Sequence, residues 1–432
     1  MSDRANDRVN DSDISRRRLL STAGAAGAAG AAGLALGGAG GAAAYAASAE
    51  DPTALTTVGS TAIAFHGEHQ AGITTPLQAR GHLIAFDLAP GAGRKEAAAL
   101  MRRWSALASE LMAGRAVGNG EGGGGGNGEG GGDTGVALDA GPSSLTVTFG
   151  FGRTFFDRTA LVAQRPPGLD PLPPFSSDHL DAKRSNGDLW VQIGADDALV
   201  AFHALRAIQR AAGDAARVRW QMNGFNRSPG ATGKPMTARN LMGQIDGTRN
   251  PKPSEPDFDK RIFVPSAAEF PWLAGGSYAV VRRIRMLLDD WEKLPLKKQE
   301  RVIGRRKSDG APLTGGSETT ELALDQTGPD GKLVVPDNAH ARIAAPEQNG
   351  GAALLRRPFS FHDGIAADGT LDAGLLFVCW QADPLRGFVP VQRKLDRGDA
   401  LSPFIRHEAS GLYAAPGGPK EGEYVGQRLL ES

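Results

Sequence analysis

The pattern of apolar and polar positions predicts strands and helices in a repeated order. Apolar residues at helical spacing predict a helix over 97–113, and segments dominated by β-branched and aromatic residues predict strands over 82–87 and 145–150. Alternation over 188–194 predicts another strand, which leads into a helix over 196–212 with an aspartate at its start. The expected order of the first half is strand, helix, strand, strand, helix, strand.

The same order recurs in the second half. The pattern predicts strands over 278–286 and 375–381, and helices over 288–304 and 384–396. Two antiparallel sheets, each with helices packed on one face, satisfy this repeated order. We therefore expect an α+β fold of two domains.

Two long segments between these elements, 223–256 and 309–353, are rich in Gly, Asn, Asp and Pro. Loops of this length are uncommon inside compact domains and are usually functional. These segments are therefore the first place to look for site residues.

The first 49 residues differ from the rest of the chain. The stretch Ser15-Arg16-Arg17-Arg18-Leu19-Leu20 precedes a Gly/Ala run that ends at Ala47-Ser48-Ala49. This arrangement is typical of an export signal with a twin-arginine start, and a low-complexity tail is the alternative. Ala and Gly are only weakly apolar, so the Gly/Ala run itself is a poor membrane span. No stable membrane span is expected after the signal is removed. We predict cleavage after Ala49 and export to the periplasm or the cell exterior.

Composition narrows the classes of function. The 59 glycines in 432 residues follow no Gly-X-Y period, which excludes collagen, and residues 118–132 contain no apolar side chain and predict a flexible surface insertion. Lys+Arg and Asp+Glu are both 48, so nucleic acid is not expected as a partner. The single Cys excludes an internal disulfide, a Cys-rich zinc site and the two-thiol attachment of c-type haem.

The most concentrated polar loop is Gly243-Gln244-Ile245-Asp246-Gly247-Thr248-Arg249-Asn250-Pro251. Its glycines would let the backbone approach a flat ligand closely, and Asp246 and Arg249 supply charge. Taken alone, the loop is explained more readily as an Asx-type turn. His340 is equally open at this point, because a lone histidine more often packs or caps than binds a metal.

Five sequence blocks together resemble the dye-decolourising peroxidases, which include an exported branch called deferrochelatase/peroxidase. They occur in the family's order and spacing between about Thr56 and Pro416. The blocks are Phe65 to Ile73 (FHGEHQAGI), Gly187 to Asp197 (GDL followed by QIGADD), Gly243 to Thr248 (GxxDGT), Asn338 to Arg342 (NAHxR) and Leu355 to Arg357 (LRR). The resemblance implies two ferredoxin-like domains, each a four-stranded antiparallel sheet, over residues 50–235 and 236–432. It also implies one haem b per chain, held mainly by the second domain.

The resemblance also assigns roles to residues. His340 maps to the iron ligand on one face of the haem, the proximal face, and a neutral imidazole suits iron. Asp246 and Arg356 map to the opposite, distal face. Cleaving the O–O bond of hydrogen peroxide needs a proton moved between its oxygens and stabilisation of the developing charge, so we assign Asp246 as proton shuttle and Arg356 as electrostatic stabiliser. The further cofactor-binding residues are Gly247, Thr248, Arg249, Ala345, Pro346 and Glu347.

One position departs from the family pattern. In relatives an acidic residue of the C-terminal segment hydrogen-bonds the proximal histidine, and this chain has Pro403 where that residue is expected. Asp399 and Glu408 are the alternatives. His66 and His69 belong to the first block and are expected to be structural, while His362 and His407 are expected at the surface or behind the site.

The function implied is an exported haem b peroxidase that reduces hydrogen peroxide and oxidises bulky organic electron donors such as dyes and phenolics. A carboxylate beside a guanidinium stays charged down to acid pH, so turnover should favour acid pH. Two alternatives remain, a deferrochelatase-like protein that releases iron from haem beside other iron-uptake components, and a non-catalytic haem carrier.

Substrates too bulky for the haem pocket would be oxidised at the surface, with electrons passing through aromatic side chains. Each of these side chains is more readily explained as a core residue. This pool consists of Trp190, Trp220, Trp272, Trp380, Tyr278 and Tyr413.

Overall fold

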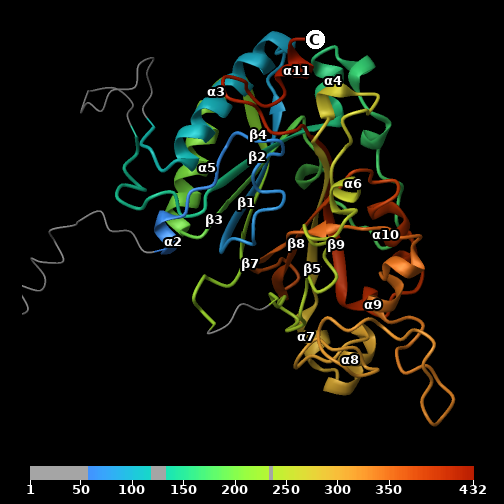
Figure 1. Ribbon diagram of the computed structural model, residues 1–432. Helices are drawn as coiled ribbons and strands as arrows, with labels where there is room; N and C mark the ends of the chain where they lie inside the picture. The colour runs from blue at the N-terminus through green and yellow to red at the C-terminus, as the bar shows by residue number, and fades with distance from the viewer. Residues whose placement is uncertain (1–56, 118–132, 233–236) are drawn as a thin grey trace, which may run out of the picture. The chain divides into compact units, whose positions relative to one another are not determined.

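The structure is a computed structural model that describes residues 57–117, 133–232 and 237–432 (Figure 1). All of them belong to one compact unit. The predicted export signal, the Gly-rich insertion and the predicted domain boundary between residues 235 and 236 lie outside the described residues, and all three stay predictions. Within the described part of the chain, no helix is long and apolar enough to cross a membrane.

The first half of the described chain forms a four-stranded antiparallel sheet with two long helices. The strands are β1 (Arg80–Leu88), β2 (Thr146–Gly152), β3 (Leu189–Ala195) and β4 (Ala216–Phe225), in the order β4-β1-β3-β2. Helix α3 (Arg94–Met112) connects β1 to β2, and α5 (Ala198–Ala212) connects β3 to β4. Helix α5 begins where the Asp197 carboxylate accepts hydrogen bonds from the backbone N–H groups of Leu199 and Val200. This is a ferredoxin-like sheet, as predicted.

The second half repeats the order. Its strands are β5 (Ser277–Met286), β7 (Phe359–Ile365), β8 (Leu371–Gln381) and β9 (Ile405–Ala415), in the order β7-β8-β5-β9, with a short β6 (Leu355–Arg356) paired to β8. Helix α10 (Phe388–Gly398) connects β8 to β9. The remaining α-helices are short: α2 (Thr57–Ser60), α4 (Arg153–Arg158), α6 (Phe258–Ile262), α7 (Leu288–Glu292), α8 (Leu296–Ile303), α9 (His340–Ile343) and α11 (Gln427–Leu430). The predicted α+β fold of two ferredoxin-like units is confirmed.

Two predicted helices were wrong in their bounds. The segment 288–304 forms α7 and α8 rather than one helix, and Pro295 lies at the break. Proline has no N–H to donate and disfavours helical geometry in the residue before it, so the chain restarts a helix there. The helix predicted from residue 384 begins at Phe388, after a turn closed by the N–H of Gly387 on the carbonyl of Asp383.

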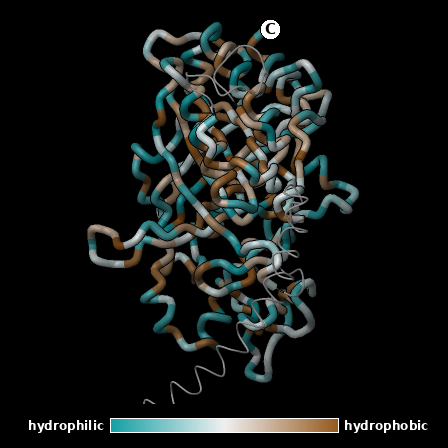
Figure 2. The backbone as a smooth tube through the Cα atoms, turned by 90° about the vertical axis from the view of Figure 1, so that its left-hand side faces the viewer, coloured by the Kyte–Doolittle hydropathy of each residue, from teal (hydrophilic) through white to brown (hydrophobic). Residues whose placement is uncertain are grey.

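The two sheets face each other. Alternate residues of β1, β3 and β5, such as Ala85, Trp190 and Ala279, belong to one buried cluster with Trp380 and Tyr413 of the second sheet. The sheets also pair at both edges, through Phe151 with Ala414 and through Phe225 with Ser360. Figure 2 shows hydrophobic stretches gathered toward the middle of the backbone trace. The outer face of each sheet, which points away from the other sheet, is therefore the face on which helices can pack.

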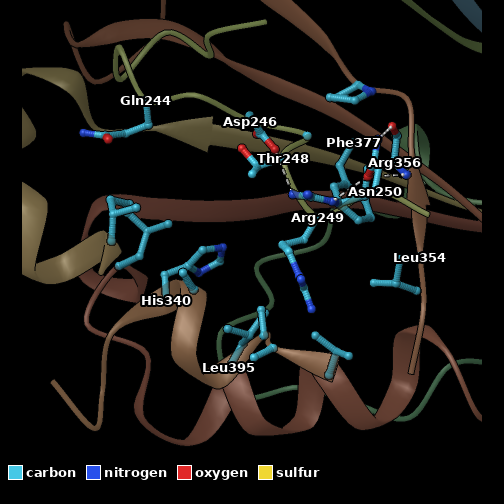
Figure 3. A pocket seen from close by; sticks show the side chains of 18 of the residues that line it. Gln244, Asp246, Thr248, Arg249, Asn250, His340, Leu354, Arg356, Phe377 and Leu395 are labelled. Carbon is cyan, nitrogen blue, oxygen red and sulfur yellow. Dashed lines mark hydrogen bonds and ion pairs between the residues drawn. The ribbon is translucent and has the colours of Figure 1, made fainter. Parts of the chain in front are cut away.

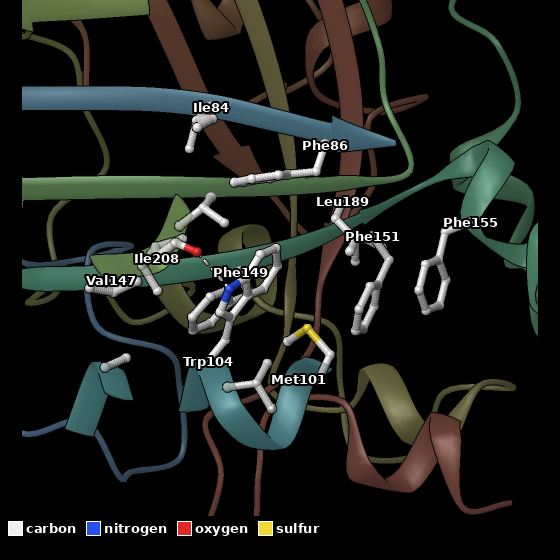
Figure 4. Close-up of a cluster of buried hydrophobic side chains, with 14 of the residues drawn as sticks. Ile84, Phe86, Met101, Trp104, Val147, Phe149, Phe151, Phe155, Leu189 and Ile208 are labelled. Atoms are coloured by element: carbon white, nitrogen blue, oxygen red, sulfur yellow. Dashed lines mark hydrogen bonds between the residues drawn. The ribbon is translucent and has the colours of Figure 1, made fainter. Parts of the chain in front are cut away.

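Helices α3 and α5 cover the outer face of the first sheet with closely packed apolar side chains (Figure 4). Trp104 of α3 is fully buried, and its ring centroid lies 4.9 Å from that of Phe86 and 5.8 Å from that of Phe149. Its indole N–H donates to the carbonyl of Ile208 on α5 at 3.0 Å. Burial of these aromatic rings stabilises the unit and leaves this face filled.

Candidate active site

The outer face of the second sheet borders a cavity instead of a packed core. The cavity has a volume of about 600 Å³, which lies in the usual range for small-molecule and cofactor sites. Ile284 and Phe377 line it from strands β5 and β8, and Val391 and Leu395 line it from α10. Because side chains alternate across a strand, these β-strand residues point away from the other sheet and into the cavity.

The nine residues that the sequence assigned to the site all line this one cavity. They come from two long segments, 226–276 between β4 and β5 and 304–354 between α8 and β6, and from β6 itself. Figure 3 shows Asp246 and Arg356 above the cavity, beside the sheet, and His340 below them. The nine are Asp246, Gly247, Thr248, Arg249, His340, Ala345, Pro346, Glu347 and Arg356.

His340 is the first residue of α9, and its ring is held by a carboxylate. Its Nδ1 lies 2.6 Å from Oδ2 of Asp399, which follows α10 and is buried. Since Nδ1 is occupied, Nε2 is the ring atom left to bind a metal. The His340 side chain is 32% exposed and lines the cavity.

The partner of His340 is one of the two that the sequence left open. Glu408 is not that partner, because it pairs with Arg283. Burial alone would lower the pKa of His340, but the charge and hydrogen bond of Asp399, followed by the charge of Asp246, raise it above its ordinary value. Asp399 is therefore the acidic partner that Pro403 cannot provide, and it makes the imidazole of His340 more basic.

The opposite side of the cavity carries an aspartate–arginine pair. Oδ1 of Asp246 accepts a hydrogen bond from Nη1 of Arg356 at 2.8 Å. Asn250 fixes the same arginine, because its Oδ1 accepts from both the backbone N–H and Nε of Arg356 at 3.2 Å. Its Nδ2 donates to the carbonyl of Arg356 at 2.7 Å. Asn250 thus holds the guanidinium in place, a role that the sequence did not predict although the residue lies in the polar loop.

Two glycines give the polar loop its shape. Gly243 has φ +77° and Gly247 has φ +122°, conformations that residues with a Cβ rarely adopt. The loop turns at each end and places Asp246 between the turns. A Cβ on Gly247 would lie 3.3 Å from Cγ2 of Thr237, so this position has little room as well.

Charged residues from both sides meet at one edge of the cavity. Arg249, which follows the distal loop residues, donates to Glu347 at 2.7 Å and lies 3.5 Å from Glu321. The Thr248 hydroxyl donates to Glu318 at 3.0 Å. The Arg249–Glu347 ion pair therefore connects the loop that carries Asp246 to the segment that follows His340.

His407 was missed as a cavity residue. It is 5% exposed and lines the cavity, because a shift of register between Arg283 and Ile284 places it opposite Ile284 on the outer face. Burial, and then the charge of Arg282, lower the pKa of His407 to about 3. Of the two positions expected for His407, at the surface or behind the site, its burial excludes the surface. Its place in the cavity lining could not be predicted, since a bulge cannot be read from strand periodicity.

The histidines of the first sequence block lie elsewhere. His69 stacks on Phe263 with 3.4 Å between ring centroids, and its Nδ1 lies 2.7 Å from the carbonyl of Gly275. Neither His66 nor His69 is among the residues that line the cavity. The structural interpretation of His69 is therefore confirmed.

The donor set fits a haem. One imidazole with a free Nε2 lies on one side and an Asp–Arg pair on the other. Apolar side chains and further arginines also line the cavity. A histidine ligand to iron with polar groups over the opposite face is a common arrangement in haem proteins. His340 would hold the iron, while Asp246, Asn250 and Arg356 would face the opposite side.

Similarity to known proteins agrees with this geometry. The family model for the Dyp-type peroxidase N-terminal domain matches residues 70–226, and the model for the C-terminal domain matches residues 237–420. A dye-decolorizing peroxidase of Thermobifida fusca is 44% identical over 372 residues, 84% of each chain. A deferrochelatase of Escherichia coli is 36% identical over 375 residues, 85% of this chain and 86% of the relative.

A solved structure is more similar still. Ferric DtpA from Streptomyces lividans is 74% identical, covers 88% of this chain and all of its own, and superposes with a TM-score of 0.83. The haem peroxidase that the sequence blocks implied is therefore confirmed, and the chain belongs to the Dyp-type peroxidase family.

Proposed function

We propose that Asp246 and Arg356 catalyse the reduction of hydrogen peroxide in this cavity and that the protein then oxidises bulky organic electron donors such as dyes and phenolics. The observation that carries the proposal is the 2.8 Å contact between Asp246 and Arg356, on the side of the cavity opposite His340. When bound, haem would supply the iron that binds peroxide and the two electrons that reduce it. Reduction of peroxide to water takes two electrons, which the organic donors replace.

The chain's own residues handle the proton and the charge. Oδ1 of Asp246 is held by Arg356. Among the described residues Oδ2 has only Asn240 at 3.5 Å, so it is available to take a proton from one peroxide oxygen and return it to the other. The Arg356 guanidinium stabilises the negative charge that develops as the O–O bond breaks. Asn250 keeps that guanidinium in position.

The test follows the absorption spectrum of the haem-loaded protein after one equivalent of peroxide. Asp246→Asn and Arg356→Leu should each slow the change by about 100-fold or more while the haem stays bound. Asp383→Asn and Arg386→Leu are matched controls, because they form a surface pair of 3.5 Å outside the cavity. Unchanged rates in both site variants would contradict these roles.

The pH dependence of turnover is a second test. Turnover should be faster at acid than at alkaline pH, and an alkaline optimum would contradict the role of Asp246.

A second candidate function is release of iron from haem, because several relatives carry the name deferrochelatase. In that case fluorescent metal-free porphyrin would accumulate without peroxide, and iron-uptake components would be the partners. A non-catalytic haem carrier would give neither porphyrin nor a reaction with peroxide.

We also propose that residues 1–49 direct export by the twin-arginine route, on the sequence pattern alone. An Arg16→Lys, Arg17→Lys double variant should then stay uncleaved in the cytoplasm. Export of that variant at the normal level would contradict the proposal.

A further inference from the structure

Five of the described arginines line the cavity, and four of them pair with carboxylates. The pairs are Arg249 with Glu321 and Glu347, Arg261 with Glu255 and Asp257, Arg282 with Asp178, and Arg356 with Asp246. Arg305 is the exception, since it forms no ion pair with any described residue. It is nevertheless buried, with 7% of its surface exposed.

The contacts of Arg305 leave half of its guanidinium without a partner. Nη1 donates to the carbonyls of Gly310 and Glu318 at 2.9 and 2.8 Å. Nη2 is buried and has no hydrogen-bond partner among the described residues. Burial, and then the charge of Arg249, lower the pKa of Arg305. A buried cation without a counter-charge is unfavourable, so a bound anion beside Nη2 would stabilise Arg305.

The nearest carboxylate does not supply that anion. Glu318 attracts the charge of Arg305 but forms no ion pair with it. Oε1 of Glu318 accepts hydrogen bonds from the hydroxyls of Thr237 and Thr248 at 2.6 and 3.0 Å. Glu318 therefore holds the loop that carries Thr248 and leaves Nη2 of Arg305 for a ligand.

The position of Arg305 indicates which ligand. Through Glu318 it adjoins Thr248. Its charge interacts with that of Arg249 and, less strongly, with that of Arg356, so Arg249 and Arg305 are two cations on the same side of the cavity. Arg249 is the outer one, with 37% of its side chain exposed, and Arg305 is the inner one. Haem b carries two propionate carboxylates on one edge, and arginine binds carboxylates in a fixed geometry.

We propose that Arg305 anchors the inner propionate of the haem through Nη2, with Arg249 beside the outer propionate. The assignment rests on haem binding in this cavity and adds an anchoring residue to it. The role proposed for Arg305 is to anchor the cofactor, and no catalytic role is assigned to it. It also holds the 310–318 loop through Nη1, so its test must separate the two roles.

The experiment compares haem with haem dimethyl ester, in which both propionates are uncharged. The affinity of the full-length apoprotein for each is measured by titration of the visible absorption, for the unmodified chain, Arg305→Met, Arg305→Lys and Arg306→Met. Arg306 is the control because it is a partly exposed neighbour paired with Asp309 and is not among the cavity residues.

Arg305→Met should weaken haem binding by about ten- to a hundredfold and leave the affinity for the ester unchanged. Arg305→Lys should recover part of the loss, and Arg306→Met should behave as the unmodified chain. An equal loss of affinity for haem and for the ester would mean that Arg305 only supports the loop. No loss of affinity for either would mean that Arg305 has no role in binding. Both results would overturn the proposal. Failure of the unmodified chain to bind haem would instead overturn the proposed function on which it rests.

Discussion

The two sheets share one strand order, but their outer faces differ in kind. The first sheet is covered by α3, of 19 residues, and α5, of 15 residues, whose apolar side chains fill the space above it. Over the second sheet α10, of 11 residues, borders a cavity of about 600 Å³. The same topology therefore gives a solid core in one half and a cavity in the other.

The difference arises in the segment after the first strand of each sheet. In the first half one long helix comes directly after β1. In the second half the segment after β5 is broken at Pro295 into α7 and α8, and the long 304–354 segment supplies His340. Fold alone thus does not determine function, because the site residues are placed by insertions in a common plan.

The largest expected effect is on the cavity side alone. His340→Ala removes the imidazole that would bind iron, so the characteristic visible absorption of the bound haem should be lost. The core beside Trp104 contains none of the site residues, so circular dichroism should stay unchanged. His362→Ala, an exposed histidine, is the control. An intact haem spectrum in His340→Ala would contradict the assignment of the ligand.

The two outer faces should respond differently to the same kind of truncation. Trp104→Ala in the filled face should lower the free energy of unfolding by about 3–5 kcal/mol, because a buried aromatic ring is lost. Leu395→Ala in the cavity wall should cost little without haem and more with haem, which would bury that side chain. Chemical denaturation of both variants with and without haem measures this. Equal costs for Leu395→Ala in the two states would show that the cavity wall does not contact the cofactor.

Much of this comparison could be predicted from the sequence. Strand and helix periodicity predicted both units, and the family motifs predicted nine residues that the structure brings into one cavity. Asn250 was missed because its partner Arg356 lies 106 residues further along the chain. Arg305 was missed because the partner proposed for it, a haem propionate, is not part of the chain. The choice of Asp399 over Glu408 also needed the structure, since sequence distance does not say which carboxylate reaches His340.

A smaller effect is expected from the carboxylate behind His340. Asp399→Asn keeps an oxygen near Nδ1 but removes the charge, so haem should stay bound while its reduction potential rises and its reaction with peroxide slows by about 10- to 100-fold. Redox titration and stopped-flow absorption measure the two changes. Glu408→Gln, the alternative partner, should leave the potential unchanged. The reverse result would restore Glu408 as the partner.

The smallest expected effect, taken over one pH unit, is a change in acid sensitivity from His407 on the cavity face. Its pKa is lowered to about 3 by burial first and by Arg282 second, whereas an unfolded histidine titrates near about 6.5. Between these values the unfolded chain binds one more proton here than the folded chain, so stability falls as pH falls through this range, by up to ~1.4 kcal/mol per pH unit. His407→Gln should reduce the slope of unfolding free energy against pH by that amount, measured by urea denaturation, with His362→Gln as control. An unchanged slope would mean that the pKa of His407 is not lowered in the folded protein, and that burial on the cavity face does not disfavour its charged form.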